Sequence, residues 1–135
     1  MAFIPSRVKY RKVQRGRRKG LAVAGSSLSF GEYGLKSLGC GTISNLQLEM
    51  IRVIMARALR KGGKFWMRIF SDRPVTKKPA ETRMGKGKGD VDHWEVVIKR
   101  GKILFEIGGV PREYAQNILR NVSYKLPFRC RFMER

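Results

Sequence analysis

The sequence predicts an α+β domain in which two helices pack on a mainly antiparallel sheet, with a basic N-terminal arm and a long basic loop. Two stretches repeat apolar residues at helical spacing, and several shorter stretches alternate apolar and polar residues as strands do. Of the 135 residues, 42% are hydrophobic, which suffices for one core without a metal or a disulfide. We therefore expect an arm over residues 1–25 and a single domain over residues 26–135.

The arm is rich in Lys, Arg and Gly and contains only isolated apolar residues. No acidic residue appears before Glu32. Eight cations lie close together in it: Arg7, Lys9, Arg11, Lys12, Arg15, Arg17, Arg18 and Lys19. Because such a segment cannot bury enough apolar surface to form a core, we expect it to become ordered on a partner.

Residues 26–38 combine large apolar side chains with nearby glycines. The apolar residues are Leu28, Phe30 and Tyr33, and the glycines are Gly31, Gly34 and Gly39. This composition predicts a short strand with a bulge or a turn.

A helix is predicted over residues 44–61, because Ser44 and Gln47 fit a capping box and Gly62 can begin a left-handed C-cap. The apolar stripe expected to face the core is Ile43, Leu46, Met50, Ile54 and Ala58. Three cations crowd the C-terminal end: Arg57, Arg60 and Lys61. They compensate the helix dipole and can also point at phosphate groups.

Residues 64–70 alternate and are expected to form a strand. One face carries Phe65, Met67 and Ile69, and the other carries Lys64, Trp66 and Arg68. Two interpretations of the second face remain open. Trp66 either stacks on a base while the two cations meet phosphate, or covers a second small hydrophobic layer.

The stretches 93–99 and 102–107 also alternate, and Arg100 and Gly101 between them predict a tight hairpin with antiparallel pairing. A second helix is expected from Pro111 to about Lys125. Its core-facing stripe is Ala115, Ile118, Leu119, Val122 and Leu126. The last segment predicts an edge strand with Phe128, Cys130 and Phe132 inward and Arg129 and Arg131 outward.

Residues 71–92 show no hydrophobic periodicity and are predicted to form a long loop. Loops of this length are either functional or disordered. Glycines alternate with Lys86 and Lys88, which lets the backbone approach a ligand while each ammonium meets a different phosphate. Arg83 adds a planar fork for phosphate or base recognition. A nucleotide-binding P-loop is excluded, since the GxxxxGK[ST] spacing does not occur.

The formal net charge of +20 indicates a polyanion, and a nucleic acid in particular, as the partner. No apolar run is long enough to span a membrane, and the two cysteines are too few and too far apart for a disulfide framework or a zinc site. His93 with Asp90 and Asp92 is the one conceivable acid-base or metal cluster, but a single histidine at a strand start is more often structural. We therefore expect a binding component with no catalytic residues, no metal, no cofactor and no small-molecule substrate.

Several stretches of the chain together resemble the bacterial-type large-subunit ribosomal protein L-sixteen family, nearly end to end. They are PSRVKYRKVQRGRRKGLA, SFGEYGLKSL, the predicted first helix, KFWMRIFSDRPVTKKPAETRMGKGKG and KILFEIGGVP. The resemblance implies a two-layer α+β protein bound to large-subunit rRNA near the base of the central protuberance. It also implies neighbouring ribosomal proteins, and a loop that reaches toward tRNA near the peptidyl-transferase region.

Carried onto this chain, the resemblance makes the eight arm cations rRNA contacts. With the other exposed cations they complete the predicted rRNA-binding set: Arg57, Arg60, Lys61, Lys64, Arg68, Arg129 and Arg131. The predicted tRNA-proximal loop is Arg83, Met84, Gly85, Lys86, Gly87, Lys88 and Gly89. The first helix departs from the family pattern, because Leu48, Ile51, Val53 and Ile54 make it more apolar.

Three functions remain open at this point. The first is a structural rRNA-binding protein that also helps position tRNA, the second a free-standing RNA-binding or RNA-chaperone module, and the third a nucleic-acid-processing enzyme that uses His93. Because the family's start already appears within residues 5–12, little room remains for a targeting extension. We therefore expect a bacterial cytoplasm, with an organelle-encoded protein in an organelle matrix as the alternative.

Overall fold

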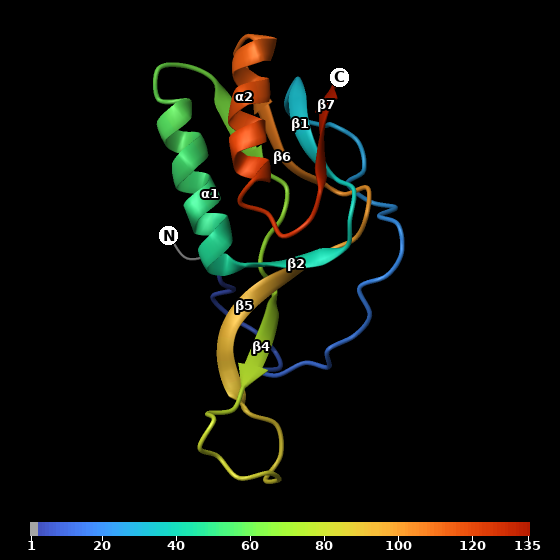
Figure 1. The fold of residues 1–135 in the computed structure, drawn as a ribbon, viewed down its shortest axis with the longest axis vertical. Helices are drawn as coiled ribbons and strands as arrows, with labels where there is room; N and C mark the ends of the chain where they lie inside the picture. The colour runs from blue at the N-terminus through green and yellow to red at the C-terminus, as the bar shows by residue number, and fades with distance from the viewer. Residues whose placement is uncertain (1–2) are drawn as a thin grey trace.

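The computed structural model describes residues 3–135, which form two antiparallel sheets and two helices (Figure 1). The four-stranded sheet has the order β3-β6-β1-β7 and the three-stranded sheet the order β2-β5-β4. The strands are β1 (Tyr33–Ser37), β2 (Gly41–Ser44), β3 (Lys64–Met67), β4 (Arg73–Lys77), β5 (Asp90–Ile98), β6 (Ile103–Gly108) and β7 (Cys130–Glu134). The helices are α1 (Asn45–Ala58) and α2 (Arg112–Ser123). The predicted α+β class is confirmed.

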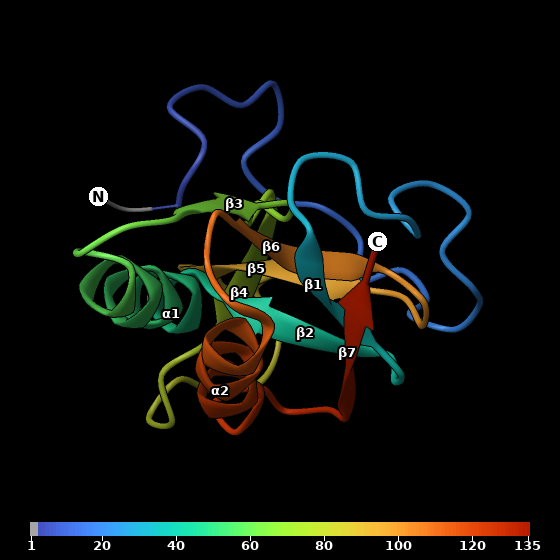
Figure 2. The ribbon, with the colours of Figure 1, turned by 90° about the horizontal axis from the view of Figure 1, so that it is seen from above.

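The two helices lie side by side and cover one side of the strands (Figure 2). Helix α2 packs against β1 and β7, whereas α1 packs against β2, β3 and β5. One continuous core joins both sheets to both helices, and its fully buried side chains include Ile43, Ile51, Met55, Phe105 and Leu119. The stripe predicted for the second helix is confirmed, since Ala115, Ile118, Leu119 and Val122 are all buried.

The predicted capping box of α1 is present, because Gln47 N–H donates to Ser44 Oγ over 3.3 Å and Ser44 N–H donates to Gln47 Oε1 over 3.0 Å. The predicted stripe is right for Ile43, which is buried, and for Ile54 and Ala58, which pack against the core, but it is wrong for Leu46 and Met50. Leu46 is 73% exposed and Met50 is 40% exposed, and the buried residues of the helix are instead Leu48, Ile51 and Met55. The error came from counting the helical phase from Ile43, which belongs to β2. The helix also ends three residues before the predicted Lys61.

We expect Ile51→Ala to lower the free energy of unfolding by about 2 to 5 kcal/mol, because the substitution opens a cavity in a fully buried site. Leu46→Ala on the same helix should change it by less than about 0.5 kcal/mol, since that side chain faces solvent. Urea unfolding of the free protein measures both. Equal losses would contradict the assignment of the buried face.

The predicted hairpin between residues 93–99 and 102–107 is wrong. Strand β5 pairs with β2 and β4, whereas β6 pairs with β1 and β3. The turn at Gly101 instead carries the chain from one sheet to the other. It is fixed on Ser37, whose carbonyl accepts from Gly101 N–H over 2.8 Å and whose N–H donates to Lys102 O over 2.8 Å.

The predicted loop over 71–92 is shorter than expected, because residues 73–77 form β4 and β5 begins at Asp90. The loop therefore spans residues 78–89. Pro74 made a strand improbable, but β4 is an edge strand of its sheet, where a missing N–H is tolerated.

The strand predicted over residues 64–70 is shorter than expected, because β3 ends at Met67, whereas the strands predicted within residues 26–38 and near the C-terminal end are confirmed. β1 contains a register irregularity between Leu35 and Lys36. β7 is an edge strand, with Arg129 and Arg131 exposed. Within residues 3–135, neither helix has the length and apolar character that crossing a lipid bilayer would need.

Candidate nucleic-acid interface

The arm runs along the β4–β5 side of the molecule and contains no regular element beyond a single bridge between Leu21 and Arg100 (Figure 1). Phe3 packs against the core, and two further sets of contacts tether the arm on either side of residues 14–20. At the first, Lys12 Nζ lies 3.3 Å from Asp90 Oδ1 and 3.1 Å from Lys88 O, while Lys88 Nζ donates to Val13 O over 2.5 Å.

The second tether lies where the arm reaches the start of β6. Ala22 N–H donates to Arg100 O over 2.8 Å, and Ile103 N–H donates to Gly25 O over 2.8 Å. Lys102 Nζ also donates to Ala24 O over 3.3 Å. The arm is therefore held at both ends of residues 14–20, although it contributes little to the core.

Most cations of the arm are exposed. Seven of the eight predicted positions are exposed: Arg7, Lys9, Arg11, Arg15, Arg17, Arg18 and Lys19. Lys12 is the exception, since it is committed to the first tether and its side chain is 33% exposed. The arm thus presents positive charge with no acidic side chain of its own to neutralise it.

The loop of residues 78–89 forms the far tip of the molecule, beyond the ends of β4 and β5 (Figure 1). Gly85 and Gly87 have φ values of 95° and 80°, and a Cβ at either position would meet no atom within 4 Å. Their glycine identity is therefore a conformational requirement. Lys78 Nζ donates to Gly85 O over 2.5 Å and closes the loop, while Arg83, Lys86 and Lys88 stay exposed.

The other predicted cations do not join the arm and loop on one face. Arg57, Arg60, Lys61 and Lys64 are exposed around the C-terminal end of α1, at the opposite end of the molecule from the loop (Figure 1). Arg131 lies on β7, at the edge of the four-stranded sheet, and Arg129 directly precedes this strand. Exposed charge thus surrounds the domain, as suits a protein embedded in a polyanion rather than one docked through a single patch.

Arg68 differs from the other predicted contacts because its guanidinium pairs with Glu106 and lies over the Phe30 ring, 5.1 Å from the centroid. Trp66 stacks on the same Phe30 ring, with centroids 6.2 Å apart. This geometry favours the second interpretation of that strand face, in which Trp66 covers a small hydrophobic layer. Arg68 is engaged within the protein.

Glu106 is the buried anion on which this layer depends. Its carboxylate accepts the backbone N–H groups of Gly31 and Phe30, each over 2.7 Å, and that of Ser29 over 3.2 Å. Burial raises the pKa of Glu106, but these N–H groups and Arg68 outweigh burial and hold the pKa below its usual value. A charged carboxylate thereby fixes residues 29–31, which join the arm to β1.

The residues considered for catalysis are not assembled into a site. His93 Nδ1 lies 2.8 Å from Asp92 Oδ2, but Asp90 is paired with Lys12. Among residues 3–135, no three His, Cys, Asp or Glu side chains gather closely enough to hold a metal ion. The thiols of Cys40 and Cys130 are free, and burial raises the pKa of Cys130 to about 11, so its unreactive thiol form persists at neutral pH.

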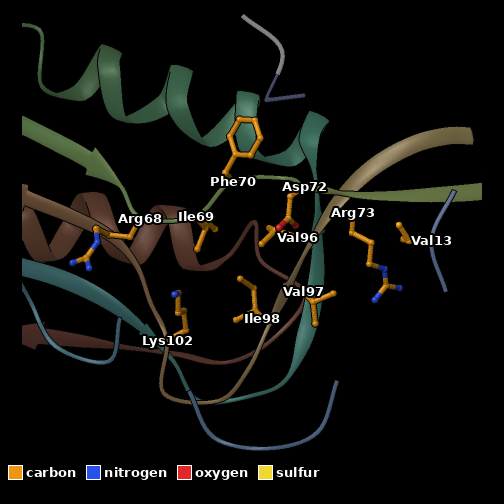
Figure 3. Close-up of a pocket in the computed structure, with 10 residues that line it drawn as sticks. All are labelled: Val13, Arg68, Ile69, Phe70, Asp72, Arg73, Val96, Val97, Ile98 and Lys102. Carbon is orange, nitrogen blue, oxygen red and sulfur yellow. The ribbon is translucent and has the colours of Figure 1, made fainter. Parts of the chain in front are cut away.

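Arg73 and Lys102 were missed by sequence reasoning. Both line cavities between the arm and the three-stranded sheet, together with Val13 from the arm (Figure 3). The sequence signal for Arg73 was its position before Pro74 in a stretch that looks like a loop. That position indicates a fixed side chain only once residues 73–77 are known to form a strand.

An α+β core under exposed cationic surfaces is typical of polyanion-binding proteins. Comparison of the sequence with known protein families specifies the class. The ribosomal protein L16p/L10e family matches residues 5–133, and the chain belongs to this family. A similar protein is the large ribosomal subunit protein uL16 of Heliobacterium modesticaldum, which is 49% identical over 133 residues, 98% of this chain and 92% of the relative. The protein is accordingly a ribosomal component and not an enzyme, which removes the His93 hypothesis.

Proposed function

We propose that the chain is a structural constituent of the large ribosomal subunit that binds large-subunit rRNA and neighbouring ribosomal proteins. The observation that carries the proposal is the arm, with seven exposed cations held against the domain by its two tethers. The relative's description as a large-subunit protein supports it. The proposed rRNA contacts are the exposed arm cations together with Arg57, Arg60, Lys61, Lys64, Arg129 and Arg131. Arg68 pairs with Glu106 but keeps further N–H donors, so its contact with rRNA stays a prediction.

Sedimentation of a cell extract in a high-salt gradient tests this function. We expect the protein to travel with the large subunit at one copy per particle, because charge pairs buried inside an assembled particle are screened by salt much less than exposed ones. A free-standing RNA-chaperone, the alternative function, would leave the particle and occur at variable stoichiometry. A bacterial cytoplasm is the proposed location, with an organelle matrix as the alternative.

We further propose that the loop of residues 78–89 approaches tRNA and positions it electrostatically. The loop is the most protruding part of the molecule and exposes Arg83, Lys86 and Lys88. The glycines between the lysines keep the backbone free of side chains, so that it can approach a ligand closely.

Substitutions in this loop should weaken tRNA binding in graded steps. Arg83→Ala should cost about 1.5 to 3 kcal/mol of tRNA affinity in a well-packed contact, because a charge-assisted hydrogen bond is lost. Arg83→Lys should fall between the wild type and Arg83→Ala, since it keeps the charge but not the bidentate geometry. Lys86→Met should resemble Arg83→Ala, whereas Lys88→Met also removes the contact to Val13 O and should loosen the arm.

The measurement is tRNA affinity and peptide-bond formation on large subunits reconstituted with each variant. Loss of bond formation with normal tRNA affinity and normal assembly would contradict a positioning role.

A further inference from the structure

Three cavities between the arm and the three-stranded sheet share lining residues, and we treat them together as one groove. Their volumes are about 510, 570 and 620 Å³. Arg73 lines all three cavities. Val13 lines the cavities of about 510 and 570 Å³, and both Val97 and Lys102 line those of about 570 and 620 Å³. Figure 3 shows the middle cavity, with Arg73 and Val13 at one end and Arg68 and Lys102 at the other.

The arch of residues 14–20, which the two tethers hold at either end, lines two of the cavities, and Val13 is the arm residue that lines the middle one. Gly16 and Gly20, with φ values of 66° and 114°, supply the bends of the arch. Arg15 and Arg18 belong to the arch and line the cavity near the loop, and Lys88 lines the same cavity from the loop side. The groove is thus cationic on both rims.

The floor has a different character. Val75 of β4 and Val97 of β5 line it and offer apolar surface. Thr42 and Thr76 add hydroxyl groups that can donate or accept. This arrangement suits a nucleotide. The cations at the rim can bind its phosphate, and the apolar floor with its hydroxyl groups can contact its base.

Arg73 occupies the centre of this arrangement. Its Nη2 lies 2.8 Å from Glu95 Oε1, the two residues are partners across β4 and β5, and their side chains are only 17% and 11% exposed. A guanidinium has five N–H donors and a bidentate carboxylate takes two, so Arg73 can hold Glu95 and donate to a phosphate as well. Its position is therefore fixed before any ligand arrives.

We propose that this groove binds a single unpaired strand of RNA, which the arm covers, with Arg73 on its backbone. An A-form duplex is recognised across its wide minor groove and along its phosphates, and it cannot enter cavities of this size below a tethered arch. An unpaired strand can, because each cavity has the volume of a small-ligand site. The inference rests on the proposed rRNA-binding function and names the form of RNA that one surface takes.

The test compares the affinity of the full-length protein for two probes of equal nucleotide number, an unstructured single-stranded RNA and a blunt RNA hairpin. The principal variant is Arg73→Gln with Glu95→Gln, which keeps the net charge unchanged and leaves no buried charge unpaired. We expect it to bind the single strand about tenfold to one hundredfold more weakly and the hairpin within about twofold of wild type.

A second variant guards against a folding defect in the first. Lys99→Gln removes an exposed cation that lines the groove, and Lys125→Gln removes an exposed cation beyond the end of α2. Lys99→Gln should weaken the single strand severalfold more than Lys125→Gln does. If each variant weakened binding of both probes equally, the proposal that the groove binds a single strand would be overturned, and the proposed function would remain. If the wild-type protein bound neither probe, the proposed function itself would be overturned.

Discussion

Neutralising the arm is expected to flatten the salt dependence of RNA binding more than any other change in the chain. Each phosphate contact contributes about 0.7 to 0.9 to the slope of log affinity against log salt, so six contacts made by the arm contribute about four to five. A fourfold rise in salt should then weaken the wild type by about two to three powers of ten more than the neutralised protein.

The structure indicates how to neutralise the arm without releasing it. Seven cations are exposed and can be replaced by Gln, while Lys12 is kept because it forms the first tether with Asp90 and Lys88. Deleting residues 1–19 removes both the charge and the tether. Comparing the two variants therefore separates phosphate contacts from the support that the tether gives the loop.

Filter binding or fluorescence anisotropy with a large-subunit rRNA fragment over a range of salt concentrations gives the slopes. The matched control replaces Lys125, which is exposed and outside the proposed interface, and should change the slope by no more than about one unit. A slope in the seven-residue variant equal to that of the wild type would show that the arm does not contact RNA.

Features determined by neighbouring residues were predictable from the sequence. The capping box of Ser44 and Gln47 depends on residues three positions apart, and the buried stripe of α2 depends on one uninterrupted helical period. The stripe of α1 was wrong at Leu46 and Met50 because its phase was counted from Ile43, which lies in a strand.

Features determined by distant partners were not predictable. The turn at Gly101 looks the same locally whether it closes a hairpin or joins two sheets, and only the pairing of Ser37 with residues 101 and 102 decides between them. Likewise, Trp66 was ambiguous because Phe30, the ring that covers it, lies 36 positions earlier in the sequence. The tether between Lys12 and Asp90 joins residues that no local pattern connects.

The residues of the candidate site also divide into those that depend on local sequence and those that depend on distant partners. The exposed cations of the arm and the glycines of the loop were identified from composition alone, because neither depends on a partner within the protein. The ion pair of Arg68 could not be predicted, because its partner Glu106 is contributed by β6, far along the sequence. A charged residue on a strand face is therefore informative only when the opposite strand is known.

Loss of the Glu106 carboxylate is expected to be the most destabilising single change of charge in the domain. The side chain is fully buried, and three backbone N–H groups and Arg68 converge on it. Glu106→Gln leaves one acceptor oxygen and turns an amide group toward donors, so we expect a loss of about 3 to 5 kcal/mol in the free energy of unfolding. Glu81→Gln, in the exposed loop, is the control and should change it by less than about 0.5 kcal/mol.

The pH dependence identifies the charge as the cause. Because the folded pKa of Glu106 lies below the unfolded value of about 4.3, its stabilisation is complete above that value and disappears as the pH falls through the folded pKa. Melting temperatures should therefore fall more steeply with acid in the wild type than in Glu106→Gln, and the two curves should converge. Parallel curves would mean that the cavity shape, and not the carboxylate charge, holds residues 29–31 in place.

Hydrogen exchange adds a local test of the same contact. At neutral pH the amides of Phe30 and Gly31 should lose protection from exchange in Glu106→Gln, while the amide of Leu59 at the end of α1 should keep its protection.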